Sequence, residues 1–297
     1  MKCTLCPKKP VADLRYDGRK LCESHFIQLV ERRARRTISK YNLFTKNDLV
    51  AVAVSGGKDS ITLLNYMKEF KKKMPLELHG IVIDEGIKGY RDSSIEIAKE
   101  NFEELEIPYT IKSFKKEFGK SLDQIAKKQK LVCSYCGVFR RRLLNQAARE
   151  LKANKIATGH NLDDELQSAL MNYFRGDFAR MARIGPKTEA RKGFVQRVKP
   201  FYEVPEKEIG LYAILKGYKM HIEECPYAYT AMRGTIRDIS NNLEEKHPGT
   251  KFQIMKGVEQ LDGILKNSPK SAKLNKCKCG ELTPAKICKA CTLLKEI

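Results

Sequence analysis

Residues 49–60, which read LVAVAVSGGKDS, hold the most reactive combination of side chains in this chain of 297 residues. An apolar stretch opens through two glycines into Lys58, Asp59 and Ser60, and a segment with helical spacing follows. Backbone N–H groups, a cation and a helix N-terminus then meet at one point, an arrangement that binds a phosphate chain. A Walker A loop is excluded because Val52 stands where that motif needs glycine. The sequence therefore predicts a site for a nucleoside triphosphate.

A second reactive group consists of three cysteines. Cys133 and Cys136 form a C-x-x-C pair directly before a predicted helix, and Cys225 lies far along the chain in EECPYAY. Three thiolates cannot close a structural zinc site, but they can hold a [4Fe-4S] cluster with one iron left open. Two alternatives stay open. One is a redox pair that carries a persulfide, and the other is a zinc site completed by His160 or His221, with Cys225 as a small buried residue.

The remaining cysteines form two sets near the ends of the chain, and each set has the spacing of a structural zinc site. The first reads C-x2-C-x15-C-x2-H, and the second opens with C-x-C where a zinc ribbon has C-x-x-C, so whether both members of that pair bind zinc stays open. The sets are Cys3, Cys6, Cys22 and His25, and Cys277, Cys279, Cys288 and Cys291.

Alternating strands and helices must position these groups, because apolar β-branched runs alternate with amphipathic stretches between residues 46 and 225. The pattern predicts an α/β fold with a doubly wound, mostly parallel sheet, and it places ligands beyond the C-terminal ends of the strands. The predicted strands are 49–54, 78–84, 109–113, 155–158 and 195–200; the predicted helices are 60–72, 92–105, 119–129, 138–152, 163–174 and 205–216.

Two further loops should meet the glycine-rich loop at that edge of the sheet. Asp84 ends the second predicted strand, where it would contact the adenosine half of a nucleotide or help to hold a metal. The segment ATGHNLDDELQS follows the fourth strand, and Asp163 or Asp164 would bind Mg²⁺ on the phosphates. Asp163 would equally well cap the helix that starts there, and His160 is expected to be a turn residue with a satisfied hydrogen bond.

The charge balance favours a polyanionic partner. Lys and Arg number 57 against 36 Asp and Glu, and the net charge of +21 is spread over several runs, including 32–36, 140–142 and 175–199. Beside a nucleotide loop, such a field favours RNA. No apolar stretch is long enough to cross a membrane, and no apolar signal core follows Met1. We therefore expect a cytoplasmic protein that keeps its ten cysteines reduced.

The string SGGKDS resembles the PP-loop of the N-type ATP pyrophosphatases. Together with GIVIDEGI, C-x-x-C-G, ATGHNLDDELQS and ECPYA, it makes nearly the whole chain similar to the TtuA-type tRNA 2-thiouridine synthetases. The resemblance implies a PP-loop domain at 29–270 between zinc modules at 1–28 and 271–297, and a homodimer. It also implies that sulfur replaces the C2 oxygen of a tRNA uridine, with ATP, Mg²⁺, two Zn²⁺ and a [4Fe-4S] cluster on three cysteines.

The family's roles can be transferred by position. The PP-loop role falls on Ser55, Gly56, Gly57, Lys58, Asp59 and Ser60, and Asp84, Gly159, Asp163 and Asp164 complete the implied ATP site. The cluster and catalytic roles fall on Cys133, Cys136 and Cys225, with Asp59 and Arg140 as further catalytic residues. Most members have lysine where this chain has Arg140. An arginine keeps the positive charge but cannot act as a base, so only electrostatic stabilisation follows.

The implied reaction has two stages. The uridine C2 oxygen attacks the α-phosphate of ATP, pyrophosphate leaves, and a sulfide on the open iron then displaces AMP. The sulfur would come from free sulfide, a desulfurase or a thiocarboxylate carrier protein. Two other functions stay open: a PP-loop tRNA thiolase that uses a cysteine persulfide without a cluster, and a non-catalytic tRNA-binding adaptor.

Overall fold

A five-stranded sheet forms the centre of the molecule, for which a computed structural model describes residues 2–191, 193–228, 232–265 and 274–297. Every neighbouring pair of strands is parallel, in the order β5-β4-β3-β6-β7. The strands are β3 (Leu49–Ala53), β4 (Glu77–Asp84), β5 (Tyr109–Ser113), β6 (Lys155–Ala157) and β7 (Gln196–Val198). The predicted doubly wound α/β fold is therefore confirmed.

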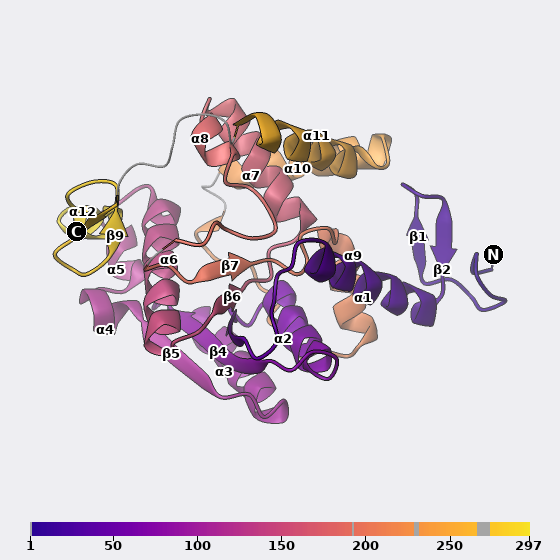
Figure 1. The fold of residues 1–297 in the computed structure, drawn as a ribbon, viewed down its shortest axis with the longest axis horizontal. Coiled ribbons are helices and arrows are strands. Elements are labelled where there is room, and N and C mark those ends of the chain that lie inside the picture. The colour runs from indigo at the N-terminus through magenta and orange to yellow at the C-terminus, as the bar shows by residue number, and fades with distance from the viewer. Residues whose placement is uncertain (1, 192, 229–231, 266–273) are drawn as a thin grey trace.

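Helices cover both faces of this sheet (Figure 1). Side chains alternate along β3, so Val50 and Val52 join one core while Ala51 joins the other. The first face carries α1 (Glu23–Lys40), α2 (Lys58–Lys71), α3 (Arg91–Glu104) and α9 (Glu206–Leu215); the second carries α4 (Phe114–Phe118), α5 (Leu122–Ala126) and α6 (Val132–Glu150). On the first face Phe102 of α3 lies directly against Gly80, where no larger residue would fit.

The order of the strands fixes where a ligand can bind. From β3 the chain proceeds outward through β4 to β5, then returns to the other side of β3 with β6 and β7. The loops after β3 and β6 therefore leave neighbouring strands in opposite directions and open a crevice between them. The glycine-rich loop follows β3 and residues 158–161 follow β6. The strand order therefore places the two loops next to each other, as the sequence predicted.

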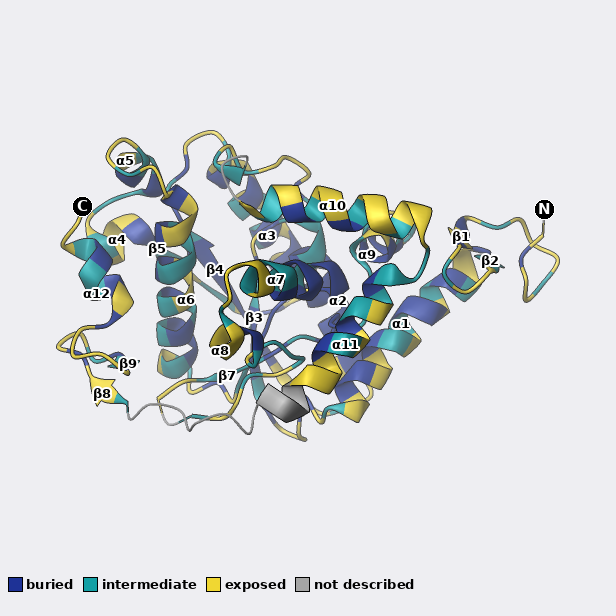
Figure 2. Ribbon diagram, turned by 90° about the horizontal axis from the view of Figure 1, so that it is seen from above, coloured by how far each residue is buried: buried dark blue, intermediate teal, exposed yellow. Residues whose placement is uncertain are grey.

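Two helices, at residues 232–265, lie in a stretch for which the sequence predicted no helix. A group of four helices packs together beside the sheet, and its members are α7 (Leu162–Phe174), α8 (Phe178–Met181), α10 (Met232–Lys246) and α11 (Thr250–Leu265). Figure 2 shows α10 and α11 with largely exposed outer faces. In α10 only Ile236 and Ser240 are buried, which is too narrow an apolar stripe to stand out in the sequence.

The helix that carries the C-x-x-C pair starts earlier than the sequence predicted. Helix α6 begins at Val132, so Cys133 and Cys136 lie in its first turns and not in a loop before it. The predicted helix at 119–129 is reduced to the short α5, since Gly119 adopts φ 75° and ends α4 there.

Small two-stranded modules stand at opposite ends of the molecule (Figure 1). The N-terminal one contains β1 (Ala12–Leu14) and β2 (Arg19–Leu21), and the C-terminal one contains β8 (Asn275–Lys276), β9 (Leu282–Thr283) and α12 (Lys289–Leu294). Helix α1 runs through the predicted domain boundary at residue 28, and the predicted boundary at 270 falls outside the described residues. No helix in the described ranges is long and apolar enough to span a membrane.

Candidate active site

The glycine-rich loop between β3 and α2 is held by close backbone packing. Gly56 adopts φ 88°, and a Cβ there would collide with the carbonyl oxygen of Ser94. The Ser60 hydroxyl accepts a hydrogen bond from Ser55 N at 3.0 Å and donates one to Gly57 O at 2.9 Å. Arg91 adds a third support, since its guanidinium donates to Ser55 O at 2.6 Å. The loop is therefore fixed before any ligand arrives.

Lys58 lies among carboxylates at the start of α2. Its ammonium is 2.8 Å from Asp59 Oδ2 and 2.6 Å from Glu206 Oε1, at the start of α9. Burial alone would lower the pKa of Lys58, but these two carboxylates outweigh it and raise the pKa. Burial raises the pKa of Asp59, against the influence of Lys58. The loop thus presents a firmly protonated cation where phosphate oxygens would bind.

The loop after β6 packs directly on this site. A Cβ on Gly159 would lie 2.8 Å from the backbone carbon and oxygen of Asp59, so the close approach requires glycine. Asn161 Nδ2 donates to Asp59 Oδ1 at 3.2 Å. Asn161 also caps α7, in a capping box in which Asp164 is the reciprocal partner. The expectation that Asp163 caps this helix is therefore wrong.

Asp163 instead makes a buried structural ion pair. One of its carboxylate oxygens binds the ammonium of Lys251 from α11, and the other accepts a hydrogen bond from Glu206 N at 2.8 Å. Only 3% of the Asp163 side chain and 7% of the Lys251 side chain are exposed. Because Asp163 is buried in this pair whereas 32% of the Asp164 side chain is exposed, Asp164 is the better placed of the two candidates for a Mg²⁺ ligand.

We expect Lys251→Ala to destabilise the fold by about 3–5 kcal/mol, because it leaves the Asp163 carboxylate buried without its counter-charge. Urea denaturation followed by circular dichroism measures the change. Lys256→Ala, an exposed lysine on the same helix, is the control and should change stability by less than about 0.5 kcal/mol. Similar free energies of unfolding for the two variants would show that the buried pair contributes little.

The structure brings Cys225 to the Cys133 and Cys136 pair. Cys136 is near enough to both other thiols for their charges to affect its pKa, which burial raises to about 12. Arg140, half exposed one turn further along α6, opposes this shift with its positive charge. Cys133 Sγ lies 3.4 Å from Tyr227 O, two residues beyond Cys225. Three thiols from two distant segments therefore converge, and Arg140 lies near those of Cys136 and Cys225.

These three residues fit a cluster better than a zinc ion. A single zinc with bonds of about 2.3 Å holds its ligand atoms close together, whereas the three sulfurs do not form a group within 4.8 Å, and no described histidine or carboxylate joins them at that range. His160 Nδ1 bonds Thr158 Oγ1 at 2.8 Å, and His221 Nε2 lies 3.0 Å from Ser93 Oγ. Both histidines thus have hydrogen-bond partners of their own. The wider spacing of the three sulfurs suits thiolates that bind separate irons of a cluster, because such thiolates stand further apart than the ligands of one zinc ion.

One acidic and two basic residues link the thiols to the nucleotide loop. Glu85 is buried and lies 2.7 Å from Arg91 Nε, the same arginine that holds Ser55, and its other oxygen lies 3.7 Å from Arg140 Nε. Asp84 beside it uses one carboxylate oxygen for its own turn, accepting from Gly86 N at 2.8 Å. A second link is made by backbone, since His221 N donates to Gly56 O at 2.9 Å four residues before Cys225.

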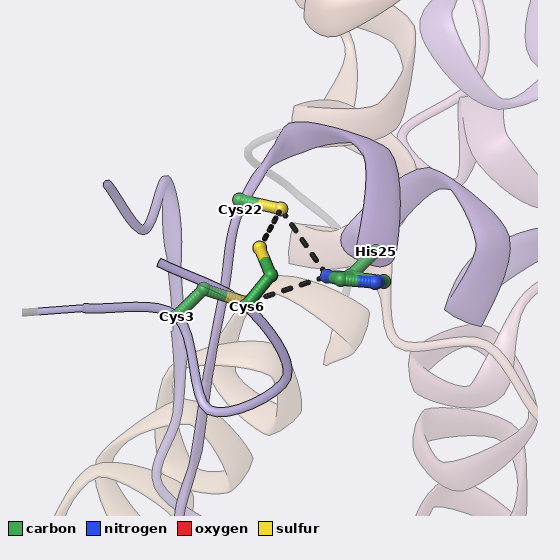
Figure 3. A group of neighbouring side chains, drawn as sticks. All are labelled: Cys3, Cys6, Cys22 and His25. Atoms are coloured by element: carbon green, nitrogen blue, oxygen red, sulfur yellow. Dashed lines mark hydrogen bonds between the residues drawn. The ribbon is translucent and has the colours of Figure 1, made fainter. Parts of the chain in front are cut away.

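The N-terminal set of ligands converges as the spacing predicted (Figure 3). Cys3, Cys6, Cys22 and His25 bring their ligand atoms within 4.8 Å of one another. The histidine presents Nδ1, which lies 3.4 Å from Cys3 Sγ and 3.3 Å from Cys22 Sγ. Cys22 precedes α1 and His25 lies in its first turn, so the helix fixes that half of the site.

The C-terminal set also converges, and the unusual C-x-C pair takes part in full. The sulfurs of Cys277, Cys279, Cys288 and Cys291 lie within 4.8 Å of one another. Gly280 at φ 86° turns the chain after Cys279. The module packs on α6, where Tyr135, between the two thiols of the C-x-x-C pair, donates from its hydroxyl to Glu296 Oε2 at 2.5 Å. Among the described residues both terminal sets fit tetrahedral zinc.

We expect the purified protein to contain two zinc ions per chain. Cys279→Ala should reduce the content to one, because three remaining thiolates bind zinc far more weakly than four. Mass spectrometric metal analysis measures this. Lys278→Ala, between the two cysteines and exposed, is the matched control and should keep both ions. Two ions in the Cys279 variant would exclude that residue as a ligand.

Sequence reasoning gave no role to Glu85, Arg91, Asn161 or Glu206, although Glu85 and Asn161 lie in the loops that it placed at the ligand-binding edge of the sheet. Their partners are remote in the chain, as the Lys58 and Glu206 pair shows with a separation of 148 residues. Only Asn161 had a local signal, since asparagine three residues before aspartate is a capping-box pattern.

The fold and the loop between β3 and α2 define the class of this protein. The family described as PP-loop domain matches residues 28–243, and the five-stranded sheet, the loop after β3 and α2 lie within those residues. The chain is thus an ATP-binding protein of the PP-loop class.

The relatives are more specific. The tRNA 2-thiolation protein NcsA of Haloferax volcanii is 39% identical, with 100% of this chain and 99% of that protein covered. The tRNA-5-methyluridine(54) 2-sulfurtransferase of Pyrococcus horikoshii is 36% identical, with 100% and 96% covered. A solved structure, the U34-tRNA thiolase NcsA of Methanococcus maripaludis with its [4Fe-4S] cluster, is 36% identical at a TM-score of 0.86, with 100% and 96% covered. The chain belongs to the family of tRNA 2-thiolation proteins, as the TtuA-type motifs predicted.

Proposed function

We propose that this protein is a tRNA-uridine 2-sulfurtransferase, which activates the C2 oxygen of a uridine with ATP and replaces it with sulfur. The convergence of three thiols beside a PP-loop carries the proposal, because adenylation alone has no use for them. The relatives, one of which is named for position 54 and one for U34, support the same reaction class.

Adenylation is assigned to the loop between β3 and α2. The amides of residues 55–60 and the start of α2 would hold the phosphates, and Lys58 would exchange Glu206 for phosphate oxygens. Asp59 and Asp164 would bind Mg²⁺, in part through water. The uridine C2 oxygen then forms a bond to the α-phosphorus as the bond to the bridging oxygen breaks, and pyrophosphate leaves with both electrons of that bond.

Sulfur transfer is assigned to the three thiols and Arg140. A [4Fe-4S] cluster held by Cys133, Cys136 and Cys225 would supply an open iron at which the incoming sulfide is kept. In the exchange, a C2–S bond forms, the C2–O bond breaks, and AMP leaves with the oxygen. Arg140 would stabilise the negative charge that develops in the transition state, and Glu85 Oε1 lies 3.7 Å from its Nε. The C2 centre is not oxidised or reduced in this exchange.

The test compares tRNA from wild-type and deletion strains by nucleoside mass spectrometry. We expect one 2-thiouridine to be lost in the deletion strain, and mapping by fragment mass gives its position. The purified protein should release pyrophosphate from ATP when tRNA is added. A complete set of thiolated nucleosides in the deletion strain would contradict the proposal.

A persulfide mechanism without a cluster is the second candidate, favoured only by the accessibility of Cys133. Anaerobic purification separates the two, because a cluster gives broad visible absorbance and a persulfide does not. We also infer a cytoplasmic location, because a relative that is 38% identical is the cytoplasmic tRNA 2-thiolation protein 1 of Dictyostelium discoideum. The homodimer stays a prediction, and sedimentation velocity tests it. The identity of the sulfur donor also stays a prediction.

A further inference from the structure

A cavity of about 520 Å³ lies away from the PP-loop, between the N-terminal module, α1 and the start of α11. Helices α1 and α11 are neighbours in the view of Figure 2, and a ring contact between Tyr16 and Phe252 joins the N-terminal module to α11. The residues that matter for its chemistry are Tyr16, Arg19, Arg32, Arg33, Arg36 and Phe252, and none of the described residues that line it is acidic.

The floor of the cavity is formed by two aromatic rings and an arginine that lies over them. The rings of Tyr16 and Phe252 lie 4.9 Å apart, and the Arg33 guanidinium lies over both, 5.7 Å and 5.4 Å from the ring centroids. Arg33 is fixed by Glu208 Oε2 at 2.7 Å and donates to the Tyr16 hydroxyl at 3.0 Å. Aromatic and guanidinium planes held in this way offer stacking surfaces for a base.

The rim of the cavity is cationic and accessible. Arg36 is 67% exposed, and its guanidinium donates to Glu203 only through Nε and Nη2. Arg32, exposed one turn before it, has no hydrogen bond or ion pair with any part of the chain that the structure describes. An arginine with unused donors beside a stacking surface suits a phosphate next to an unpaired base.

We propose that this cavity binds one nucleotide of the substrate tRNA, its phosphate on Arg32 and Arg36 and its base against Tyr16 and Phe252. The inference rests on the proposed function for the choice of RNA. The first turn of α9 supports both sites, since Glu206 contacts Lys58 and Glu208 contacts Arg33. The cavity is therefore built on the same helix as the nucleotide loop, and would orient the tRNA relative to it.

The experiment uses the full chain and a fluorescently labelled, unmodified tRNA transcript, and measures affinity by anisotropy at several salt concentrations. Arg32→Ala is compared with Arg35→Ala, which removes the same charge from an exposed position of α1 outside the cavity. We expect Arg32→Ala to weaken binding about five- to tenfold near 0.1 M salt and to lower the salt slope by about 1. Arg35→Ala should stay within about twofold of wild type.

The experiment distinguishes a failure of the cavity assignment from a failure of the proposed function. Equal losses in the two variants would mean that only net charge matters and would overturn the cavity assignment, even if wild-type protein thiolates tRNA. A wild-type protein that binds no tRNA would overturn the proposed function as well. Ultraviolet cross-linking gives an independent readout: cross-links should map to peptides that contain Tyr16 or Phe252, and cross-links confined to other peptides would contradict the proposal.

Discussion

Cys225→Ala should abolish tRNA thiolation, by at least about a hundredfold, while the protein stays folded and still binds ATP. Among the described residues this thiol lies near those of Cys133 and Cys136, so its removal leaves two. The segment keeps its place through its backbone, because His221 N still donates to Gly56 O. The measurements are 2-thiouridine formation by mass spectrometry, visible absorbance after anaerobic purification, and ATP affinity by calorimetry.

Ile222→Ala is the matched control for this prediction. Ile222 lies on the same segment, is 84% exposed, and loses more atoms in the substitution than Cys225 does. It should retain activity, absorbance and ATP affinity. Full thiolation by the Cys225 variant would contradict the sulfur-transfer assignment. Loss of ATP binding would show that the cysteine has a structural role instead.

Gly56→Ala should remove ATP binding and destabilise the fold by about 2–3 kcal/mol. A side chain at φ 88° is strained in itself, and its Cβ would also collide with the Ser94 backbone, which cannot rotate away. The loop must then shift, and its amides lose their alignment toward the phosphates. Thermal unfolding and calorimetric titration with ATP measure the two effects.

Gly57→Ala provides the contrast. Gly57 has φ −76°, and the nearest atom to an added Cβ is Ser55 Oγ at 3.6 Å. Its free energy of unfolding should stay within about 1 kcal/mol of wild type. If both variants unfolded at the same temperature, the contact with Ser94 would not be what selects glycine at position 56.

The sequence predicted the strands and the ligand-bearing loops well because their signals are local. An apolar run ended by glycines determines both β3 and the loop after it, and each set of zinc ligands lies within a short stretch of chain. The sequence placed the start of α6 too late because the signal for that part of the helix is not local. Residues 132–137, VCSYCG, are weak helix formers, and the helix there depends on Val132 and Tyr135 packing in the core with the remote C-terminal module.

The role of Asp163 could not be read from the sequence either. Two neighbouring aspartates at a helix start look equivalent, and what separates them is Lys251, which lies 88 residues away. Helix α11, which carries that lysine, was itself not predicted. Non-local partners of this kind decide which of two similar side chains faces the ligand.

The hydrogen bond from His221 N to Gly56 O makes the peptide that bears the third thiol an extension of the loop that receives ATP. The segment that bears Cys225 is therefore anchored to the glycine-rich loop four residues before its thiol. In the proposed reaction, this one hydrogen bond would hold the thiol at a constant place relative to the phosphates.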